Sequence, residues 1–153
     1  MITYKQLIEE IESYRGFHKA PSPEQDTSSP LHDLSKTYPE DIYGPKGAQY
    51  YGHHGHNHSM DIESINTIQS SRGKPDKKVK IYRAVPKTQS SPETPKMEIN
   101  KGDWVTINRG YAKEHGQSHL RGKYKILSKS VPAKHIFTNG DSIHEYGYHN
   151  TDI

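Results

Sequence analysis

The sequence predicts an α+β fold, with helices in the N-terminal part and a mostly antiparallel β-sheet after them. Two observations lead to this prediction. Apolar residues recur with helical spacing early in the chain, and from residue 79 onwards they alternate with polar residues as in half-buried strands. A run of strands that follows the helices is typical of α+β domains.

The first expected element is a helix from Thr3 to Tyr14. Thr3 and Gln6 form a capping box, and Gly16 stands where the end of a helix favours glycine. The apolar residues between them return with the period of one helix face.

Residues 17–58 lose this periodicity, because prolines interrupt them and their apolar residues are isolated. A structureless loop of this length is unusual inside a compact domain. The segment is therefore either an ordered arm around the core or partly mobile. We expect one compact domain with two regions, an N-terminal helix and Pro/His-rich arm (1–58) and a core (59–153).

A second helix is expected from Asp61 to Arg72, with Asp61 as its N-cap and Gly73 at its end. Three isoleucines with helical spacing are expected to face the core: Ile62, Ile65 and Ile68.

Strands follow this helix, separated by short turns. They are expected at residues 79–85, 97–99, 104–107, 122–131 and 142–148. Asn108 is a suitable N-cap for a two-turn helix over residues 109–115, closed by Gly116. Residues 132–137 are expected to form a short turn or helix.

The composition limits the function classes. Leu, Ile, Val and Phe make up only 25 of the 153 residues, and the net charge is +3, so we expect a thin core rather than disorder. Without cysteine, the chain has no disulfides, thiolate metal ligands or cysteine nucleophile. No stretch approaches the ~18 apolar residues of a membrane helix, and the N-terminus lacks the apolar run of a signal peptide. We therefore expect a cytoplasmic protein with no membrane partner.

Arg83 and Glu145 are candidate functional residues because each shares a strand face with apolar neighbours. A guanidinium group on a core-facing row is costly unless an anion meets it. Arg83 is therefore half of an internal ion pair, a residue at a strand end that reaches the rim, or a cleft arginine that binds a phosphate or carboxylate. Glu145 lies between Ile143 and Gly147 on its face, which suggests a cleft, unless it pairs with Arg83. Thr106 alone reads as an ordinary strand threonine.

Three motifs contain these residues. They are Ile81-Tyr82-Arg83-Ala84-Val85-Pro86, Gly102-Asp103-Trp104-Val105-Thr106-Ile107-Asn108 and Glu145-Tyr146-Gly147-Tyr148. In their order and spacing, the motifs resemble the Arg-Ser-Glu branch of the mono-ADP-ribosyltransferases, and among these the small enzymes carried by bacteriophages and mobile elements. The resemblance covers roughly residues 50 to 148.

This resemblance implies a split antiparallel sheet and an enzyme that consumes NAD⁺ without a metal. Arg83 would contact an NAD⁺ phosphate, and the main chain near Ala84 would hold the carboxamide. Thr106 would orient Glu145, the catalytic glutamate, which would bond the ribose 2′-hydroxyl. Tyr111 would stack on the nicotinamide. The residues implied in NAD⁺ binding are Arg83, Ala84, Thr106, Asn108, Tyr111 and Glu145. The residues implied in catalysis are Glu145, Arg83 and Thr106. The chain lacks Gly-x-Gly-x-x-Gly, consistent with NAD⁺ as a consumed substrate.

The implied partner is a macromolecular acceptor, a protein more than a nucleic acid, in keeping with an effector in counter-defence or host takeover. The family often has Glu or Gln two residues before the catalytic glutamate, where it engages the acceptor. Here that residue is Ile143, which argues against arginine as the acceptor. Two alternatives stay open: an NAD glycohydrolase, in which water replaces the acceptor, and a non-catalytic phage-type binding or inhibitor module.

A histidine cluster occupies residues 53–58. His54, His56 and His58 alternate, so an extended segment would offer three imidazoles to zinc, nickel or copper. No cysteine or clear carboxylate partner completes such a site, and a histidine-dense loop also captures metals adventitiously. We expect no physiological metal site, and the loop could instead border the active site.

Overall fold

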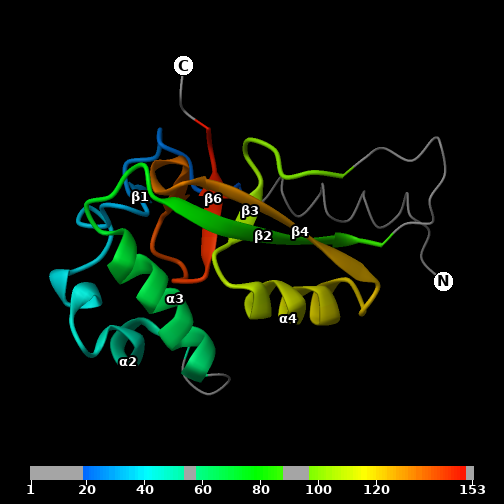
Figure 1. Ribbon diagram of the computed structural model, residues 1–153, viewed down its shortest axis with the longest axis horizontal. Helices are drawn as coiled ribbons and strands as arrows, with labels where there is room; N and C mark the ends of the chain where they lie inside the picture. The colour runs from blue at the N-terminus through cyan, green and yellow to red at the C-terminus, as the bar shows by residue number, and fades with distance from the viewer. Residues whose placement is uncertain (1–18, 54–57, 88–96, 151–153) are drawn as a thin grey trace.

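The computed structural model describes residues 19–53, 58–87 and 97–150, which form a six-stranded antiparallel sheet with helices beside it (Figure 1). The strands are β1 (Ser29–Pro30), β2 (Lys78–Pro86), β3 (Trp104–Thr106), β4 (Tyr124–Pro132), β5 (Ile136–Thr138) and β6 (Glu145–Tyr148). The helices are α2 (Gly47–Tyr51), α3 (His58–Ser71) and α4 (Arg109–His119), with short 3-10 turns η1 (Glu40–Tyr43) and η2 (Ala133–His135). The predicted α+β class is confirmed for these residues.

The strand order in the sheet is β1-β5-β6-β3-β2-β4, and each neighbouring pair is antiparallel. Tyr82 of β2 pairs with Thr106 of β3, and Thr106 pairs in turn with Glu145 of β6. Directly opposed residues of antiparallel strands point to the same face of a sheet. Tyr82, Thr106 and Glu145 therefore form one row across three central strands.

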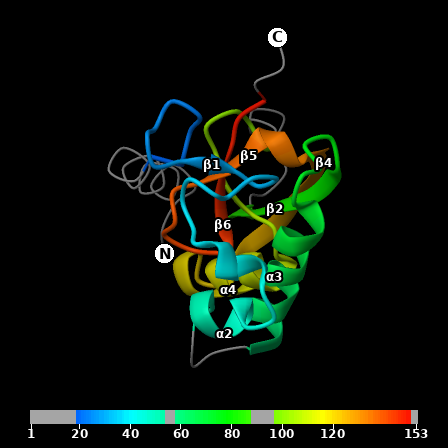
Figure 2. The same cartoon turned by 90° about the vertical axis from the view of Figure 1, so that its left-hand side faces the viewer.

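The helices lie along one side of the sheet. Figure 1 shows α3 and α4 below β2 and β4, and the view turned by 90° again shows α2, α3 and α4 grouped below the strands (Figure 2). The main core contains Ile65 and Ile68 of α3 together with Ile81 of β2 and Val131 of β4. Within the part of the chain that the structure describes, no helix has the length and apolar character of a membrane span.

The irregular arm is ordered over residues 19–53 and contributes to this core. Leu31, Leu34 and Ile42 are fully buried, in the same cluster as the residues of α3 and β2. The arm also supplies β1, which pairs with β5 at the edge of the sheet. Of the two alternatives for this segment, ordered wrapping thus holds for its described part. The helix expected from Thr3 to Tyr14 lies outside the described residues.

Helix α3 differs from its prediction in two respects. Ile65 and Ile68 are buried as expected, but Ile62 is 41% exposed, so its prediction was wrong. The helix begins at His58, which places Asp61 inside the first turn instead of at the N-cap. Asp61 is buried there, because its carboxylate has partners elsewhere in the fold, described below.

The strand predictions also need correction. Residues 97–99 form no strand, because β3 already pairs on both of its edges, with β2 and β6. The last strand begins at Glu145 and not at residue 142. Residues 136–138 form β5 instead of ending a short helix, because β1 and β6 pair with them from distant parts of the chain.

Helix α4 begins as predicted, since the Asn108 side chain accepts a hydrogen bond from Tyr111 N at 3.2 Å. It continues past Gly116, the expected end, to His119. Gly116 is required inside the helix, because a Cβ there would overlap the ring of Tyr124 on β4. The glycine allows α4 to pack closely on the sheet.

Gly147 allows the arm to cross β6, and we expect Gly147→Ala to lower the free energy of unfolding by about 2 kcal/mol. A Cβ at this position would overlap the backbone carbonyl oxygen of Pro21, which cannot rotate away as a side chain could. Urea denaturation would measure the loss. Gly44→Ala is the matched control, because its Cβ would come no closer than 3.3 Å to Asp41 O. An equal effect of both substitutions would contradict this account of Gly147.

Candidate functional site

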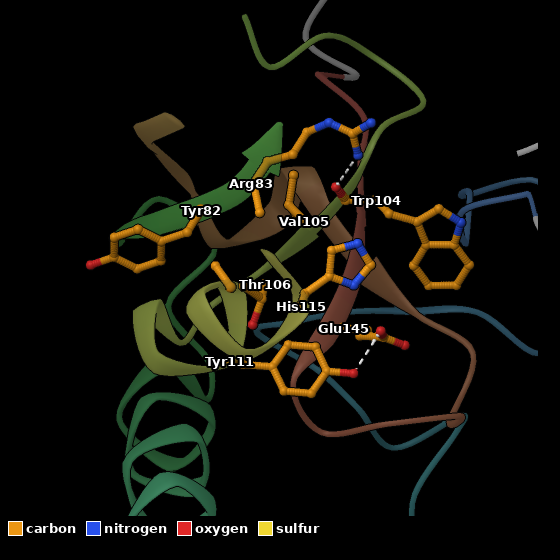
Figure 3. A pocket seen from close by; sticks show the side chains of 10 residues that line it. Tyr82, Arg83, Trp104, Val105, Thr106, Tyr111, His115 and Glu145 are labelled. Carbon is orange, nitrogen blue, oxygen red and sulfur yellow. Dashed lines mark hydrogen bonds between the residues drawn. The ribbon is translucent and has the colours of Figure 1, made fainter. Parts of the chain in front are cut away.

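A pocket opens between the central strands and α4 (Figure 3). Its volume is about 370 Å³, including space open to solvent. Its walls come from four elements: Tyr82, Arg83 and Ala84 of β2, Trp104, Val105 and Thr106 of β3, Tyr111, Ala112 and His115 of α4, and Glu145 of β6.

Most of the site residues expected from the sequence meet at this pocket. Those that line it are Arg83, Ala84, Thr106, Tyr111 and Glu145. Asn108 is not among the lining residues. It is 1% exposed, and its backbone N–H donates to Thr106 Oγ1 at 3.1 Å while its side chain caps α4. Asn108 therefore connects the strand that carries Thr106 to the helix that carries Tyr111.

Arg83 is held at the pocket wall by its neighbours on β3. Its Nη1 donates to Trp104 O at 2.8 Å, and its Nε lies 3.9 Å from Asp103 Oδ2. The side chains of Arg83 and Asp103 are only 12% and 10% exposed. Of the alternatives for Arg83, the structure shows an internal pair, made with Asp103 and not with Glu145. A guanidinium group has five N–H donors, so these contacts leave donors for a further anion.

We expect Arg83→Ala to lower the free energy of unfolding by about 1–3 kcal/mol, because it leaves the mostly buried carboxylate of Asp103 without its cation. Asn100 N still donates to Asp103 Oδ2 at 2.8 Å, which limits the loss. Asp103→Asn should cost less, since it removes the charge but keeps the shape. Urea denaturation of both variants checks this order, and the reverse order would contradict it.

Glu145 is partly exposed and accepts a hydrogen bond from the Tyr111 hydroxyl at Oε1, at 2.7 Å (Figure 3). The Tyr111 ring is stacked on the buried ring of His144, with centroids 4.9 Å apart and planes 24° apart. One face of Tyr111 is thus covered by protein, and its hydroxyl group is directed at the carboxylate. The arrangement orients Glu145 at the edge of the pocket.

A buried polar network lies behind Tyr111, and the sequence analysis did not anticipate it. His144 is 1% exposed, with Nε2 3.0 Å from Asp61 Oδ1 and Nδ1 2.6 Å from Ser64 Oγ. Burial lowers the pKa of His144, and the hydrogen bond to Asp61 opposes this only in part. A neutral imidazole satisfies both contacts when Nε2–H donates to Asp61 and Ser64 donates to Nδ1.

The network extends to α4 and to the arm. Asn108 Nδ2 donates to Ser64 Oγ at 3.2 Å, which joins the α4 cap to α3. His53 N donates to the carboxylate of Asp61, at 3.1 Å to Oδ1. The network thus holds α3, α4 and the residue before β6 in register.

Folding stability should fall as the pH drops below about 6.5, because the pKa of His144 is lowered in the folded state. An unfolded histidine titrates near ~6.5, so between the two pKa values the unfolded chain binds more protons. The stabilisation is thus complete above the unfolded pKa and is lost as the pH falls through the folded one. Urea midpoints between pH 7.5 and 5 would measure the slope. His144→Gln should reduce it, whereas the exposed His58→Gln should not; an unchanged slope in His144→Gln would contradict this assignment.

The histidine cluster is described only in part. His53 contacts the site, since its ring lies 4.7 Å from that of His144 and its Nε2 2.8 Å from Ser142 Oγ. His53 therefore lies beside the polar network and beside the ring of the pocket residue Tyr111. His54 and His56 lie outside the described residues, so the three-imidazole arrangement is not tested. Within residues 19–53, 58–87 and 97–150, no group of three or more His, Asp or Glu is placed to hold a metal ion.

His115 is a pocket residue that the sequence analysis did not single out. Burial lowers its pKa, and the positive form of His119, whose ring is stacked on it at 4.4 Å, lowers it further. His115 is therefore a neutral imidazole near pH 7, able to accept a proton. Its spacing of four residues from Tyr111 was the available signal, because residues four apart share a helix face.

Ile143, two residues before Glu145, is 1% exposed and belongs to the main core. It presents no polar group to the pocket. Comparisons with protein-family models, curated proteins and solved structures find no match to this chain.

Proposed function

We propose that the pocket binds the nicotinamide–ribose part of NAD⁺, and that the protein is an NAD⁺-dependent mono-ADP-ribosyltransferase with the fold of the Arg-Ser-Glu branch. The observation that carries the proposal is the convergence of Arg83, Thr106 and Glu145 on one pocket. These residues are far apart in the sequence and come from three strands, β2, β3 and β6.

The chemistry of the pocket suits the cleavage of an N-glycosidic bond. As the bond between ribose C1′ and the nicotinamide nitrogen breaks, the ribose becomes oxocarbenium-like and the bonding electrons leave with neutral nicotinamide. A carboxylate beside the ribose stabilises that positive charge. Glu145 is suited to this role because Tyr111 engages Oε1, which leaves Oε2 to accept a hydrogen bond from the ribose 2′-hydroxyl.

Arg83 and Thr106 would position the substrate for this step. The remaining donors of Arg83 can bind a phosphate of NAD⁺. Thr106 Oγ1 accepts from Asn108 N, so its own hydrogen can be donated towards the pocket. The acceptor then forms the new bond to C1′ and loses a proton, which neutral His115 can take. An enzyme that consumes NAD⁺ in this way would act on a macromolecule in the cytoplasm.

A second candidate is an NAD⁺ glycohydrolase, and the burial of Ile143 favours it. Because the usual acceptor-engaging position offers no polar side chain, water could reach C1′ instead. The two candidates share the departure of nicotinamide and differ in what takes the ADP-ribose.

The test uses the full chain with NAD⁺ labelled in its adenylate phosphate, in the presence of a bacterial lysate. We expect free nicotinamide together with label bound to macromolecules. Nicotinamide with only free ADP-ribose would identify a glycohydrolase. No nicotinamide release above a protein-free control would overturn both enzymatic candidates and support a non-catalytic binding module.

A further inference from the structure

The charged residues of this chain are segregated along the sequence, although the net charge is only +3. Residues 74–134 contain 15 of the 21 Lys and Arg residues but only 5 of the 18 Asp and Glu residues, a net charge of +10. The remaining parts of the chain carry 6 basic and 13 acidic residues, a net charge of −7. Such an asymmetry is typical of proteins that bind a polyanion.

The fold gathers the basic segment on one part of the molecule. It forms β2, β3, α4 and β4; β2 lies between β3 and β4 in the sheet, and α4 packs against all three. Figure 1 shows α4 below the right-hand parts of β2 and β4, and α2 and α3 towards the lower left, where β2 begins. The elements of the basic segment are therefore neighbours in the fold.

Most of the positive charge in this segment faces solvent. We use the term basic surface for the exposed Lys and Arg residues of β2, α4 and β4: Lys78, Lys80, Arg109, Lys113, Lys125 and Lys129. Lys78 and Lys80 lie on the Tyr82 face of the sheet, whereas Lys125 and Lys129 lie on the Arg83 face. Two of the segment's acidic residues are paired internally, Asp76 with Lys134 at 2.9 Å and Asp103 with Arg83. The other described acidic residues of the segment, Glu98 and Glu114, cannot balance the basic surface.

We propose that the basic surface binds the phosphate backbone of a nucleic acid and brings it past the mouth of the pocket. Backbone phosphates attract exposed Lys and Arg side chains whatever the base sequence of the nucleic acid. This electrostatic attraction is sufficient for non-specific binding. The pocket adds partly exposed aromatic side chains of the kind on which bases stack: Tyr82, Trp104, Tyr111 and His115.

The distribution of apolar residues argues for this partner over a membrane or a protein. A membrane-binding face needs exposed apolar side chains, and a protein interface needs an apolar centre. In the part of the chain that the structure describes, the large hydrophobic residues that are exposed are Tyr50 and Ile62, on α2 and α3. The basic surface carries neither.

The inference names nucleic acid as the class of the ADP-ribose acceptor, and this step rests on the proposed function. β2 and α4 contribute residues both to the pocket lining and to the basic surface, so a strand bound along these two elements would pass the pocket that Glu145 and His115 line. A base nitrogen or a hydroxyl group of the strand would bond to C1′ as nicotinamide leaves, and its proton would pass to His115. The binding itself does not depend on the reaction.

The binding test measures the fluorescence anisotropy of labelled 20-nucleotide single-stranded DNA and RNA with the full chain. We expect binding at 50 mM NaCl that weakens about tenfold or more at 200 mM, as phosphate contacts demand. Lys113→Gln with Lys125→Gln should raise Kd at least fivefold and lower the salt slope by about 1.4, or about 0.7 per contact for a single strand. Lys36→Gln with Lys46→Gln removes the same charge from exposed positions of the arm and should leave Kd within twofold.

Three outcomes would overturn the binding inference: no binding at 50 mM NaCl, equal weakening by the two double variants, or tighter binding to vesicles with 30% phosphatidylserine than to nucleic acid. Label transferred from NAD⁺ to protein alone would overturn the acceptor assignment. Loss of binding with intact nicotinamide release would leave the proposed function standing. Intact binding without nicotinamide release would overturn the proposed function and leave the basic surface as a nucleic-acid site.

Discussion

Glu145→Gln is expected to slow nicotinamide release from NAD⁺ by about 10²-fold or more while the fold remains intact. Removal of one group that stabilises transition-state charge costs on the order of 10²–10³ in rate. Glutamine has the same shape and can still accept the hydrogen bond from Tyr111 at the Oε1 position. The substitution therefore removes the negative charge and little else.

The measurement is the initial rate of nicotinamide release at saturating NAD⁺, with urea denaturation to compare stability. Glu114→Gln is the matched control, because it removes a carboxylate from an exposed position of α4 outside the pocket lining. It should leave the rate unchanged. An equal rate for wild type and Glu145→Gln would refute the catalytic role. Loss of cooperative unfolding in Glu145→Gln would instead identify Glu145 as a structural residue.

Asp61→Ala is expected to lower the free energy of unfolding by about 2–5 kcal/mol, the largest effect on stability among the substitutions considered, because each donor left without a partner costs about 1–3 kcal/mol. The Asp61 side chain is 7% exposed and accepts from His53 N and from Nε2 of the buried His144. Alanine would leave both donors without a partner, which costs more than the hydrogen bonds themselves contribute. Since these bonds join α3 to the arm and to the residue before β6, the loss should affect the whole domain.

Urea denaturation measures this effect, with Glu63→Ala as a control from an exposed position on the same helix. The control should change stability by no more than about 0.5 kcal/mol. Asp61→Asn should retain much of the stability, because the amide oxygen can still accept a hydrogen bond. If the loss in Asp61→Ala were no larger than in the control, the buried network would not be stabilising.

The elements that the sequence predicted well are those with local signals. The alternation from Val79 to Val85 corresponds to β2, and the Asn108 cap does begin α4. Both signals depend on residues a few positions apart along the chain, so they can be recognised in one sequence without knowledge of the tertiary structure. The sequence also indicated Arg83 and Glu145 as candidate residues, because a charged side chain among apolar neighbours is costly without a partner, but it left their partners open.

The parts that were missed depend on partners far along the chain. Residues 29–30 and 136–138 become strands because they pair with each other and, for β5, with β6. Asp61 has the local pattern of a helix cap, yet its position is decided by His144, 83 residues later. The charge segregation was visible in the sequence, but a total of +3 conceals it, and only charges summed by segment reveal it.

The sequence by itself determined the class of fold, the positions of the long helices and strands, and the side-chain types available for chemistry. Tertiary structure alone decided that Arg83 pairs with Asp103, that Tyr111 holds Glu145, and that His115 joins them in the pocket. The physical reason is the distance along the chain over which each kind of interaction acts. Backbone periodicity and capping act over a few residues, whereas burial and hydrogen bonding of polar groups depend on which distant segments the packed core brings together.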